Sequence, residues 1–339
     1  MTAPCSDCHN SKEPPTLTDD FQRKIDYVRL AVTADCNLRC SYCMREEHEE
    51  HTSRADQLST EEIHTIINVL AEQGITKLRL TGGEPLLQHD IVEIVRRAKQ
   101  QPNIQTVNLT TNGLLLDKLL AKLIDAGLDS INVSIDTLRR DRYKTITRRD
   151  EFERAKSNFT MLLESNMVPV KLNVVVIKRI NSDELEDFVA LTRDYPLIVR
   201  FIELQPFDDN QIWRTGQFFG ADKIQEMLTT LYPEMQILKS SATQNFTFSL
   251  PNHQGQVAII PAYTRNFCHD CNKIRITSTG KIISCLYGKE GIELLPLLRS
   301  GASNEAIAAL FRKAVALKPE NGKHAASNGV RTSMSEIGG

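Results

Sequence analysis

The chain has 339 residues, 41% of them hydrophobic, and a formal net charge of −2 at pH 7. This length allows a large core and one α/β domain with an appended region. The balanced charge argues against a nucleic-acid binder or a protein that binds anionic membranes, so an anionic ligand would need a local basic cluster. Because the chain has neither a long apolar run nor a signal-peptide core, we expect a cytoplasmic protein with no membrane contact.

The eight cysteines fall into three groups along the chain. The groups are Cys5 with Cys8, then Cys36, Cys40 and Cys43, and finally Cys268, Cys271 and Cys285. Such clustering is typical of metal sites rather than of a scattered disulfide framework. It predicts a reducing compartment.

Residues 1–24 are polar and contain proline without sustained periodicity, which predicts a flexible N-terminal extension. Cys5, Cys8 and the following His9 could hold a metal. An isolated pair in a flexible tail is more often incidental, and we favour that interpretation.

From Tyr27 onward, short β-branched runs alternate with amphipathic stretches. The runs predict strands over 27–33, 77–81, 106–110, 130–135, 170–177 and 198–204. A capping box of Ser59 and Glu62 precedes a helix that ends at Gly74. Further helices are expected over 91–99, 116–126, 152–165 and 183–193, the last capped by Ser182.

Strands separated by single helices run parallel with right-handed crossovers. The six strands predict an α/β fold over residues 25–206, an open or partial (β/α)6 barrel of the TIM type. Binding sites in such folds lie at the carboxyl ends of the strands. The first three-cysteine loop directly follows the first strand, so we expect it at this end.

The regular alternation is lost after Pro206. Residues 207–318 predict a C-terminal α+β region with a helix over 222–231, several antiparallel strands, the second three-cysteine group and helices over 294–318. Residues 319–339 are rich in Gly, Ser and Asn and end in Gly338 and Gly339. This composition predicts a flexible tail.

Cys36, Cys40 and Cys43 form a CxxxCxxC pattern with Tyr42 before the last cysteine. Three thiolates on a [4Fe-4S] cluster leave one iron without a protein ligand, whereas a zinc site would need a fourth ligand such as His48 or His51. The spacing resembles that of the radical S-adenosylmethionine (SAM) enzymes. This resemblance implies that the open iron chelates SAM and that an electron from the cluster produces a 5'-deoxyadenosyl radical.

The second strand ends in Thr81-Gly-Gly-Glu84-Pro85. Glycines there allow close backbone approach to a ligand, and the Glu84 carboxylate could accept from an ammonium group, although a simple tight turn is an equal alternative. The resemblance implies that this stretch binds SAM. The SAM-binding residues that it implies are Tyr42, Gly83, Glu84, Ser134 and Gln205.

The second group, Cys268, Cys271 and Cys285, also supplies three thiols. A fourth ligand from His269 or Asp270 would make a zinc ribbon, whereas a [4Fe-4S] cluster would keep a free iron for a substrate nitrogen or oxygen. Basic residues lie on or beside the predicted strands, namely Arg29, Arg79, Lys171, Arg200, Lys273 and Arg275. One of them alone would indicate an internal salt bridge, but six directed to one mouth of the barrel suggest a polyanion such as a nucleoside triphosphate.

Together with the terminal Gly-Gly, these features resemble the GTP 3',8-cyclases of molybdenum cofactor biosynthesis over Asp26 to Gly339. The resemblance implies two [4Fe-4S] clusters and SAM. The radical would remove hydrogen from the ribose 3' carbon of GTP, the sugar radical would attack C8 of guanine, and the second cluster would hold guanine. The implied GTP-binding residues are Arg29, Arg79, Thr110, Lys171, Arg200, Lys273, Ile274 and Arg275. The implied catalytic residues are Cys36, Cys40, Cys43, Gly338 and Gly339, with the Gly-Gly tail reaching into the barrel.

Two positions depart from the family's pattern. Gln205 stands where the family usually has Met, and Lys273 stands where it usually has Arg. Lysine keeps the charge but lacks the planar fork of arginine, so SAM or GTP affinity would change more than the reaction type.

The resemblance also implies an electron donor of unknown identity and a downstream cyclic pyranopterin monophosphate synthase. The sequence does not reveal the oligomeric state, for which a homodimer is one alternative. Two other functions fit the cysteines. One is a peptide-modifying radical SAM enzyme with an auxiliary cluster, and the other is a zinc-stabilised binding module without catalysis.

Overall fold

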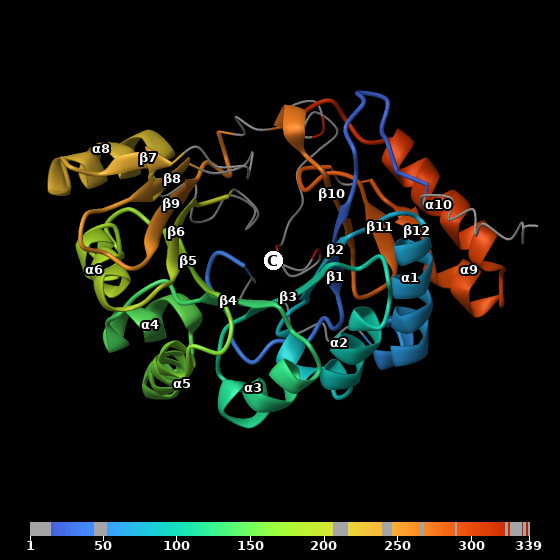
Figure 1. Ribbon diagram of the computed structural model, residues 1–339, viewed down its shortest axis with the longest axis horizontal. Coiled ribbons are helices and arrows are strands. Elements are labelled where there is room, and N and C mark those ends of the chain that lie inside the picture. The colour runs from blue at the N-terminus through green and yellow to red at the C-terminus, as the bar shows by residue number, and fades with distance from the viewer. Residues whose placement is uncertain are drawn as a thin grey trace, which may run out of the picture.

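The computed structural model describes residues 15–43, 53–205, 216–238, 246–264, 268–288 and 290–322, with residues 325, 334 and 337. Its strands form one 12-stranded sheet in the order β12-β11-β10-β1-β2-β3-β4-β5-β6-β9-β8-β7. Figure 1 shows the sheet curving around the centre of the molecule with helices on its outside. Because β7 and β12 are unpaired edges in this order, the barrel is open.

Six parallel strands form the middle of the sheet, as the sequence predicted. They are β1 (Tyr27–Ala31), β2 (Lys77–Thr81), β3 (Thr106–Thr111), β4 (Ser130–Ser134), β5 (Val170–Val176) and β6 (Ile198–Glu203). Each pairs in parallel with the next. The predicted partial (β/α)6 barrel is confirmed.

The predicted connecting helices are present with similar bounds, namely α1 (Thr60–Glu72), α2 (Ile91–Lys99), α3 (Leu116–Asp125), α5 (Phe152–Ser165) and α6 (Leu185–Asp194). The structure adds η1 (Arg54–Asp56), η2 (Pro85–Leu87) and α4 (Arg140–Thr147). The capping box of Ser59 and Glu62 is present in both directions. None of the described helices is long and apolar enough to cross a membrane.

One local expectation was wrong, and one helix was missed. Ser182 does not cap α6, because the N-cap is Glu184 and the Ser182 hydroxyl accepts from the backbone N–H of Arg179. Helix α4 was not predicted. Its sequence, RDRYKTIT, carries few apolar residues and therefore no sustained stripe.

The C-terminal region contains α8 (Ala221–Leu231), β7 (Gln236–Leu238), β8 (Phe246–Ser249), β9 (Gln256–Ile260), η3 (Cys268–Asp270), β10 (Lys273–Ile276), β11 (Lys281–Ile283), β12 (Ile292–Glu293), α9 (Leu295–Arg299) and α10 (Asn304–Ala316). The expected antiparallel pairs exist, but β9 joins β6 in parallel and β10 joins β1 in parallel. The region therefore extends both edges of the barrel sheet.

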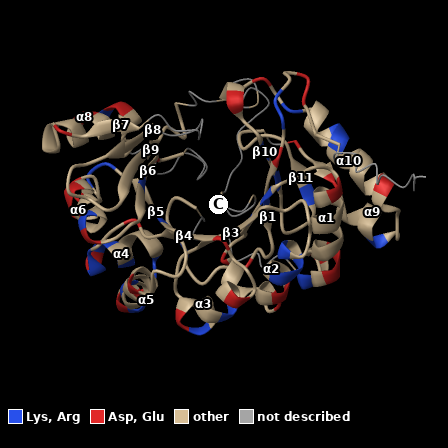
Figure 2. Cartoon of the chain, viewed as in Figure 1, with Lys and Arg blue, Asp and Glu red and all other residues tan. Residues whose placement is uncertain are grey.

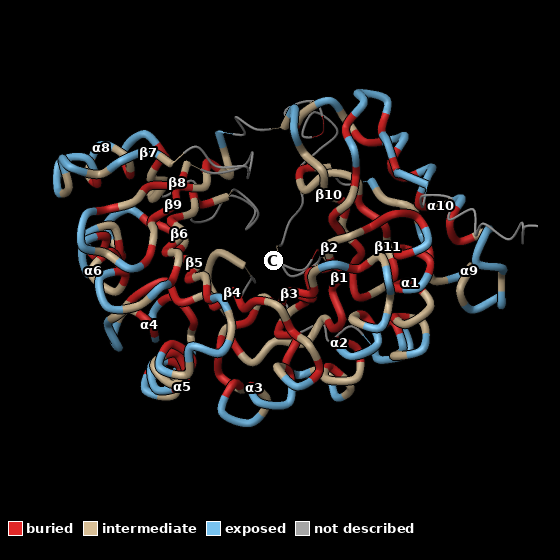
Figure 3. Tube along the Cα trace, in the orientation of Figure 1, coloured by how far each residue is buried: buried red, intermediate tan, exposed pale blue. Residues whose placement is uncertain are grey.

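Along each inner strand, successive side chains point alternately to the hydrophobic core and to the interior of the barrel. On β1, Val28 and Leu30 are fully buried in the main hydrophobic cluster, whereas Tyr27 and Arg29 point to the other face. Figure 3 shows that buried residues follow the strands and that exposed residues lie mostly on the outer helices. The inner face of the sheet is thus free to carry polar side chains.

The prediction of a flexible extension does not hold for residues 15–24. Leu17 and Asp19 are buried, and Thr18 forms a bridge with Lys24. The predicted tail is packed as well at Ala325 and Ile337, which are buried. Buried apolar and ion-paired side chains hold residues 15–24, whose composition alone indicates flexibility. Cys5, Cys8, His9, Gly338 and Gly339 lie outside the described residues.

Candidate functional site

The loop that carries Cys36, Cys40 and Cys43 follows β1 and is held by α4. The backbone N–H of Arg39 donates to the carbonyl of Thr147 at 3.0 Å, and that of Ser41 donates to Ile146 at 2.8 Å. Leu38 packs with Tyr143 in a small cluster that also contacts Cys36 and Cys40. A helix that the sequence did not predict thus fixes the loop.

Gly82 and Gly83 lie directly against this loop. A Cβ atom on Gly83 would lie 2.2 Å from the carbonyl oxygen of Asp35, and one on Gly82, at φ +150°, would lie 2.4 Å from that of Thr33. The sequence interpretation assigned these glycines to close approach by a ligand. The structure shows that the backbone of the cysteine loop already requires them.

Glu84 joins the loops that follow β2 and β3. Its carboxylate accepts from the hydroxyl of Thr111 at 2.6 Å and from the backbone N–H groups of Asn112 at 2.8 Å and Leu86 at 3.0 Å. Burial raises the pKa of Glu84 to about 7, against the opposing effect of these donors. Glu84 is therefore a positioning residue in this structure, and its contact with a SAM ammonium group stays a prediction.

Asp136, a residue that the sequence analysis did not single out, anchors Tyr42. The Tyr42 hydroxyl donates to Asp136 at 2.6 Å, and the other carboxylate oxygen accepts from the backbone N–H of Val175 at 2.8 Å. Burial raises the pKa of Asp136 to about 6. The signal in the sequence that could have indicated Asp136 was an acidic residue immediately after the fourth predicted strand.

Ser134 and Gln205 lie at the carboxyl ends of β4 and β6, as predicted. The Ser134 hydroxyl accepts from the Asn173 amide at 3.4 Å. The buried Gln205 Oε1 has no hydrogen-bond partner in the described part of the chain. Both side chains remain available for a polar ligand.

The chemistry of the first three thiols fits an iron-sulfur cluster. Burial raises the pKa of Cys36 to about 11 and that of Cys43 to about 12, and it also raises the pKa of Cys40. Such thiols stay protonated at neutral pH unless a metal replaces the proton. A single zinc ion is a poorer fit, because no three described His, Cys, Asp or Glu residues are grouped to hold one ion, whereas each cysteine of a cubane binds a different iron. His48 and His51 lie outside the described residues.

The second three-cysteine group is held by backbone and lysine contacts. The Gly322 N–H donates to the Cys268 sulfur at 3.3 Å, and Lys318 Nζ donates to the carbonyls of Lys273 at 2.8 Å and Ser284 at 2.7 Å. Burial opposes ionisation of Cys271, but the ammonium of Lys318 leaves the pKa of this thiol below its usual value. The buried Lys318 was missed by the sequence analysis.

His269 and Asp270 do not complete this second site. They contact each other at 2.9 Å with mostly exposed side chains, and neither belongs to a group in the described chain that could hold one metal ion. The described residues therefore give no support to the zinc-ribbon interpretation.

The two cysteine groups lie at opposite ends of β1. Because β10 runs parallel to β1 with Lys273 beside Tyr27, Cys271 lies at the amino end, whereas Cys36 follows the carboxyl end. The strand path from Tyr27 to Thr33 spans about 20 Å at the usual rise per residue. The expectation that the first group lies at the carboxyl end is confirmed, whereas the position of the second group at the amino end was not predicted.

The predicted basic residues lie between these two ends. Arg29 is in register with Arg79 on β2 and with Arg275 on β10. The strands β5 and β6 contribute Lys171 and Arg200, and Figure 2 shows basic positions on the strands around the centre. We call the set Arg29, Lys77, Arg79, Lys171, Arg200, Lys273 and Arg275 the cation cluster. Lys77 was missed by the sequence analysis because it begins its strand.

Burial and mutual repulsion destabilise these charges. Burial, followed by the charge of Arg275, lowers the pKa of Arg29 to about 9, and burial, followed by Arg200, lowers that of Lys171 to about 8. Burial also lowers the pKa of Lys273 to about 8. Groups in this state gain stability from a bound anion.

Three further residues complete the description of the barrel interior. The Thr110 hydroxyl accepts from Arg79 at 3.3 Å, which places it beside the cation cluster, and its contact with GTP stays a prediction. The side chain of Ile274 is fully buried in the hydrophobic core, and its contact with GTP stays a prediction. The buried Asn132, in register with Thr110 and Lys171, has no described partner for Oδ1 and was missed by the sequence analysis.

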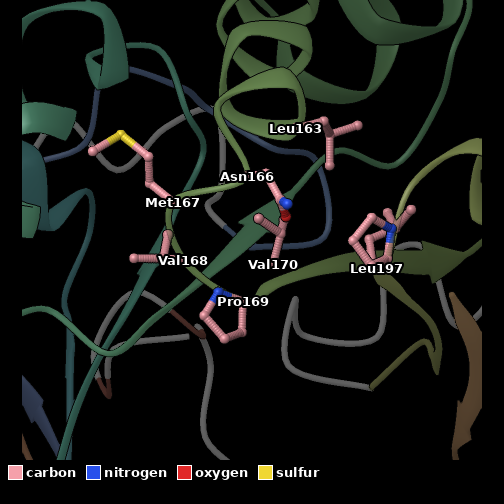
Figure 4. A pocket seen from close by; sticks show the side chains of 8 residues that line it. Leu163, Asn166, Met167, Val168, Pro169, Val170 and Leu197 are labelled. Atoms are coloured by element: carbon pink, nitrogen blue, oxygen red, sulfur yellow. The ribbon is translucent and has the colours of Figure 1, made fainter. Parts of the chain in front are cut away.

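A cavity of about 300 Å³ lies elsewhere, where β5 and β6 begin. Figure 4 shows its mainly apolar lining, which includes Leu163, Met167, Val168 and Leu197. None of the predicted site residues lines it. Its lining offers no group for the chemistry considered above.

Comparison with known proteins gives two family matches. Residues 30–192 match the Radical SAM superfamily, and residues 197–324 match Molybdenum Cofactor Synthesis C. The chain is 48% identical to the GTP 3',8-cyclase of Chlorobaculum tepidum over 95% of this chain and 97% of that protein. It is 42% identical to the GTP 3',8-cyclase of Alkaliphilus metalliredigens over 95% of this chain and 100% of that protein.

Solved structures resemble the chain in fold. Streptococcus suis SuiB bound to the precursor peptide SuiA matches with a TM-score of 0.58 and 15% identity, covering 93% of this chain and 70% of that one. At this identity the likeness concerns the fold alone. It therefore does not favour the peptide-modifying alternative.

Proposed function

The chain belongs to the GTP 3',8-cyclase family of radical SAM enzymes, and we propose that it converts GTP to (8S)-3',8-cyclo-7,8-dihydroguanosine 5'-triphosphate, the first step of molybdenum cofactor biosynthesis. The observation that carries this proposal is the cation cluster between two groups of three cysteines. A triphosphate supplies the negative charge that would neutralise these cations. A peptide substrate or a zinc-binding module gives no reason for it.

The first three cysteines would hold a [4Fe-4S] cluster, and the residues beside them would hold SAM. When bound, this pair supplies the 5'-deoxyadenosyl radical that abstracts hydrogen. Tyr42, Gly83, Ser134 and Gln205 lie at the carboxyl ends of the strands, on the side of Cys36, where they can orient SAM. Glu84 supports this arrangement by fixing two of the loops.

The cation cluster would orient GTP along the interior of the barrel. Arg29, Arg79 and Lys171 can contact the phosphates from three different strands, which fixes the position of the ribose relative to SAM. Cys268, Cys271 and Cys285 would hold a second [4Fe-4S] cluster at the other end and present it to guanine. The charge of Lys318 beside Cys271 supports thiolate ligation there.

The remaining predicted contributions belong to this proposal. Gly338 and Gly339 would help organise the radical step from the end of the chain. We also propose a separate one-electron donor, use of the product by a cyclic pyranopterin monophosphate synthase, and a homodimer. The family membership supports the place in this pathway.

Anaerobic incubation of the protein with SAM, a reductant and GTP tests the proposal. We expect an isomer of GTP to form together with 5'-deoxyadenosine, detected by mass analysis. Lys171→Met should lower the yield, whereas Lys144→Met, on the exposed part of α4, should not. Release of 5'-deoxyadenosine that is independent of GTP, without the isomer, would contradict the cyclase function.

A further inference from the structure

Tyr27 lies in the middle of the cation cluster. It is only 6% exposed, at the amino end of β1, in register with Lys77 on β2 and Lys273 on β10. The Nζ atoms of these lysines lie 4.9 and 5.2 Å from the centre of its ring. Both distances are within the range of a cation–π interaction.

The hydroxyl of Tyr27 also receives a hydrogen bond from a guanidinium group. Nε of Arg79 donates to it at 2.6 Å, a short contact that is typical of a charge-assisted bond. The same guanidinium donates through another nitrogen to Leu109 and Thr110 at 3.3 Å. Tyr27 therefore holds one edge of the planar Arg79 guanidinium. Because the group is planar, this contact also determines the orientation of its other nitrogens.

The charges around Tyr27 come from its own strand, from both neighbouring strands and from two strands further along the sheet. They are Arg29 on its own strand, Lys77 and Arg79 on β2, Lys273 and Arg275 on β10, Lys171 on β5 and Arg200 on β6. Burial raises the pKa of Tyr27, but the positive charges of Arg79, Arg29 and Lys273 outweigh it and lower the pKa to about 6. Several charged groups act strongly on the cations Arg29, Lys171, Arg200 and Lys273. Within the described chain, the acidic ones among them are the Tyr27 phenol and the Cys271 thiol.

We propose that Tyr27 is a positioning residue whose phenolate is the internal counter-ion of the cation cluster and is replaced in that role by the triphosphate. The phenolate holds Arg79 and offsets the repulsion between the cations while the site is empty of substrate. When a triphosphate binds, its negative charges neutralise the same cations. The phenolate is then no longer stabilised by them, and it takes up one proton from solvent. This inference rests on the proposed function only in naming a triphosphate as the anion.

The ionisation of Tyr27 can be measured directly on the anaerobic holoenzyme. Tyrosine labelled with ¹³C at Cζ reports phenol or phenolate by NMR. We expect one tyrosine to titrate near pH 6, whereas burial raises the pKa of Tyr42, Tyr143 and Tyr232. The low-pH titration therefore identifies Tyr27 even if a variant does not fold. Inorganic tripolyphosphate added at neutral pH should convert this signal to the phenol form.

Two variants separate charge from packing. Tyr27→Phe keeps the ring but removes the oxygen, and Tyr27→Glu restores a negative charge without the ring. We expect Tyr27→Phe to lower the thermal stability of the holoenzyme and Tyr27→Glu to recover part of it. If Tyr27 acts only through packing, the Glu variant will be the less stable of the two.

Tripolyphosphate affinity gives a second readout. Above about pH 6, only the wild type must protonate a phenolate when tripolyphosphate binds. The dissociation constant of the wild type, divided by that of Tyr27→Phe, should therefore rise with pH by up to about tenfold per pH unit. Tyr232→Phe, which removes the hydroxyl of a distant tyrosine beside His253, should follow the wild type. A Tyr27 that stays a phenol at pH 8, or does not respond to tripolyphosphate, overturns the inference.

These outcomes are distinct from failure of the cyclase proposal. If tripolyphosphate converts Tyr27 to the phenol but GTP is not cyclised, the counter-ion role stands and the proposed reaction fails. If GTP is cyclised while Tyr27 remains a phenol throughout, the reaction stands and the inference fails.

Discussion

Replacing Arg23 by Met is expected to loosen the second cysteine group and the segment after α10 together. Arg23 donates to Asp19 at 2.5 Å and to the carbonyls of Cys268 at 2.8 Å, Glu320 at 2.8 Å and Pro319 at 2.7 Å. The side chains of Arg23 and Asp19 are 6% and 0% exposed. One side chain thus connects the N-terminal segment, the second cysteine group and the C-terminal segment.

The magnitude follows from what the substitution leaves behind. Asp19 would keep its two backbone donors but lose its cation, and removing one partner of a buried pair costs about 3–5 kcal/mol. If the loss is confined to this region, local opening should increase by roughly a hundredfold to a few thousandfold. We therefore expect faster amide hydrogen exchange at residues 17–25 and 319–322 and faster loss of iron from the second site to a chelator.

Two controls decide whether this reasoning is correct. Arg97→Met breaks an exposed ion pair with Glu93 at 3.1 Å and should change stability by less than about 1 kcal/mol. Asp19→Asn combined with Arg23→Met removes the isolated charge and should recover part of the loss. If Arg23→Met matched Arg97→Met in exchange rates and iron retention, the proposed connection would be refuted.

Three further predictions concern the first cysteine loop. Folding raises the pKa of Glu84 from 4.5 to about 7. The contribution of Glu84 to the free energy of unfolding is therefore complete below pH 4.5 and is lost as the pH rises towards 7, by at most about 3 kcal/mol. Glu84→Gln should flatten this pH dependence in urea titrations. Asp136→Asn should weaken SAM binding about tenfold in calorimetry by releasing Tyr42, and adding Tyr42→Phe should cost little more if the two act as one pair. Gly83→Ala should lower the iron content of the first site, since its Cβ would overlap the Asp35 carbonyl; normal iron content would show that the loop can move aside.

The sequence predicted the barrel and its first cysteine loop because both depend on short-range patterns. A parallel sheet follows from β-branched runs separated by amphipathic helices, and the CxxxCxxC spacing lies within one loop. The capping box of Ser59 and Glu62 is local in the same way and was confirmed. Helix α4 escaped prediction because it is stabilised by contacts with the cysteine loop rather than by its own apolar stripe.

The candidate site was only partly predictable. The cations Arg29, Arg79, Lys171 and Arg200 could be recognised because charged residues inside strands need an explanation. Lys77 and Tyr27 gave no such signal, since a lysine or tyrosine at the start of a strand is common. Their importance appears only when the register places Tyr27 between Lys77 and Lys273, a residue from the far end of the chain.

By itself, the sequence determined the strand alternation, the two groups of three thiols and the presence of unusual charges within strands. The tertiary structure decided where these elements lie relative to one another, because pairing of β10 with β1 depends on contacts between residues nearly 250 positions apart. That pairing places the second cysteine group at the amino end of the sheet and surrounds Tyr27 with cations. No local pattern carries this information, since burial and register arise only when distant segments pack together.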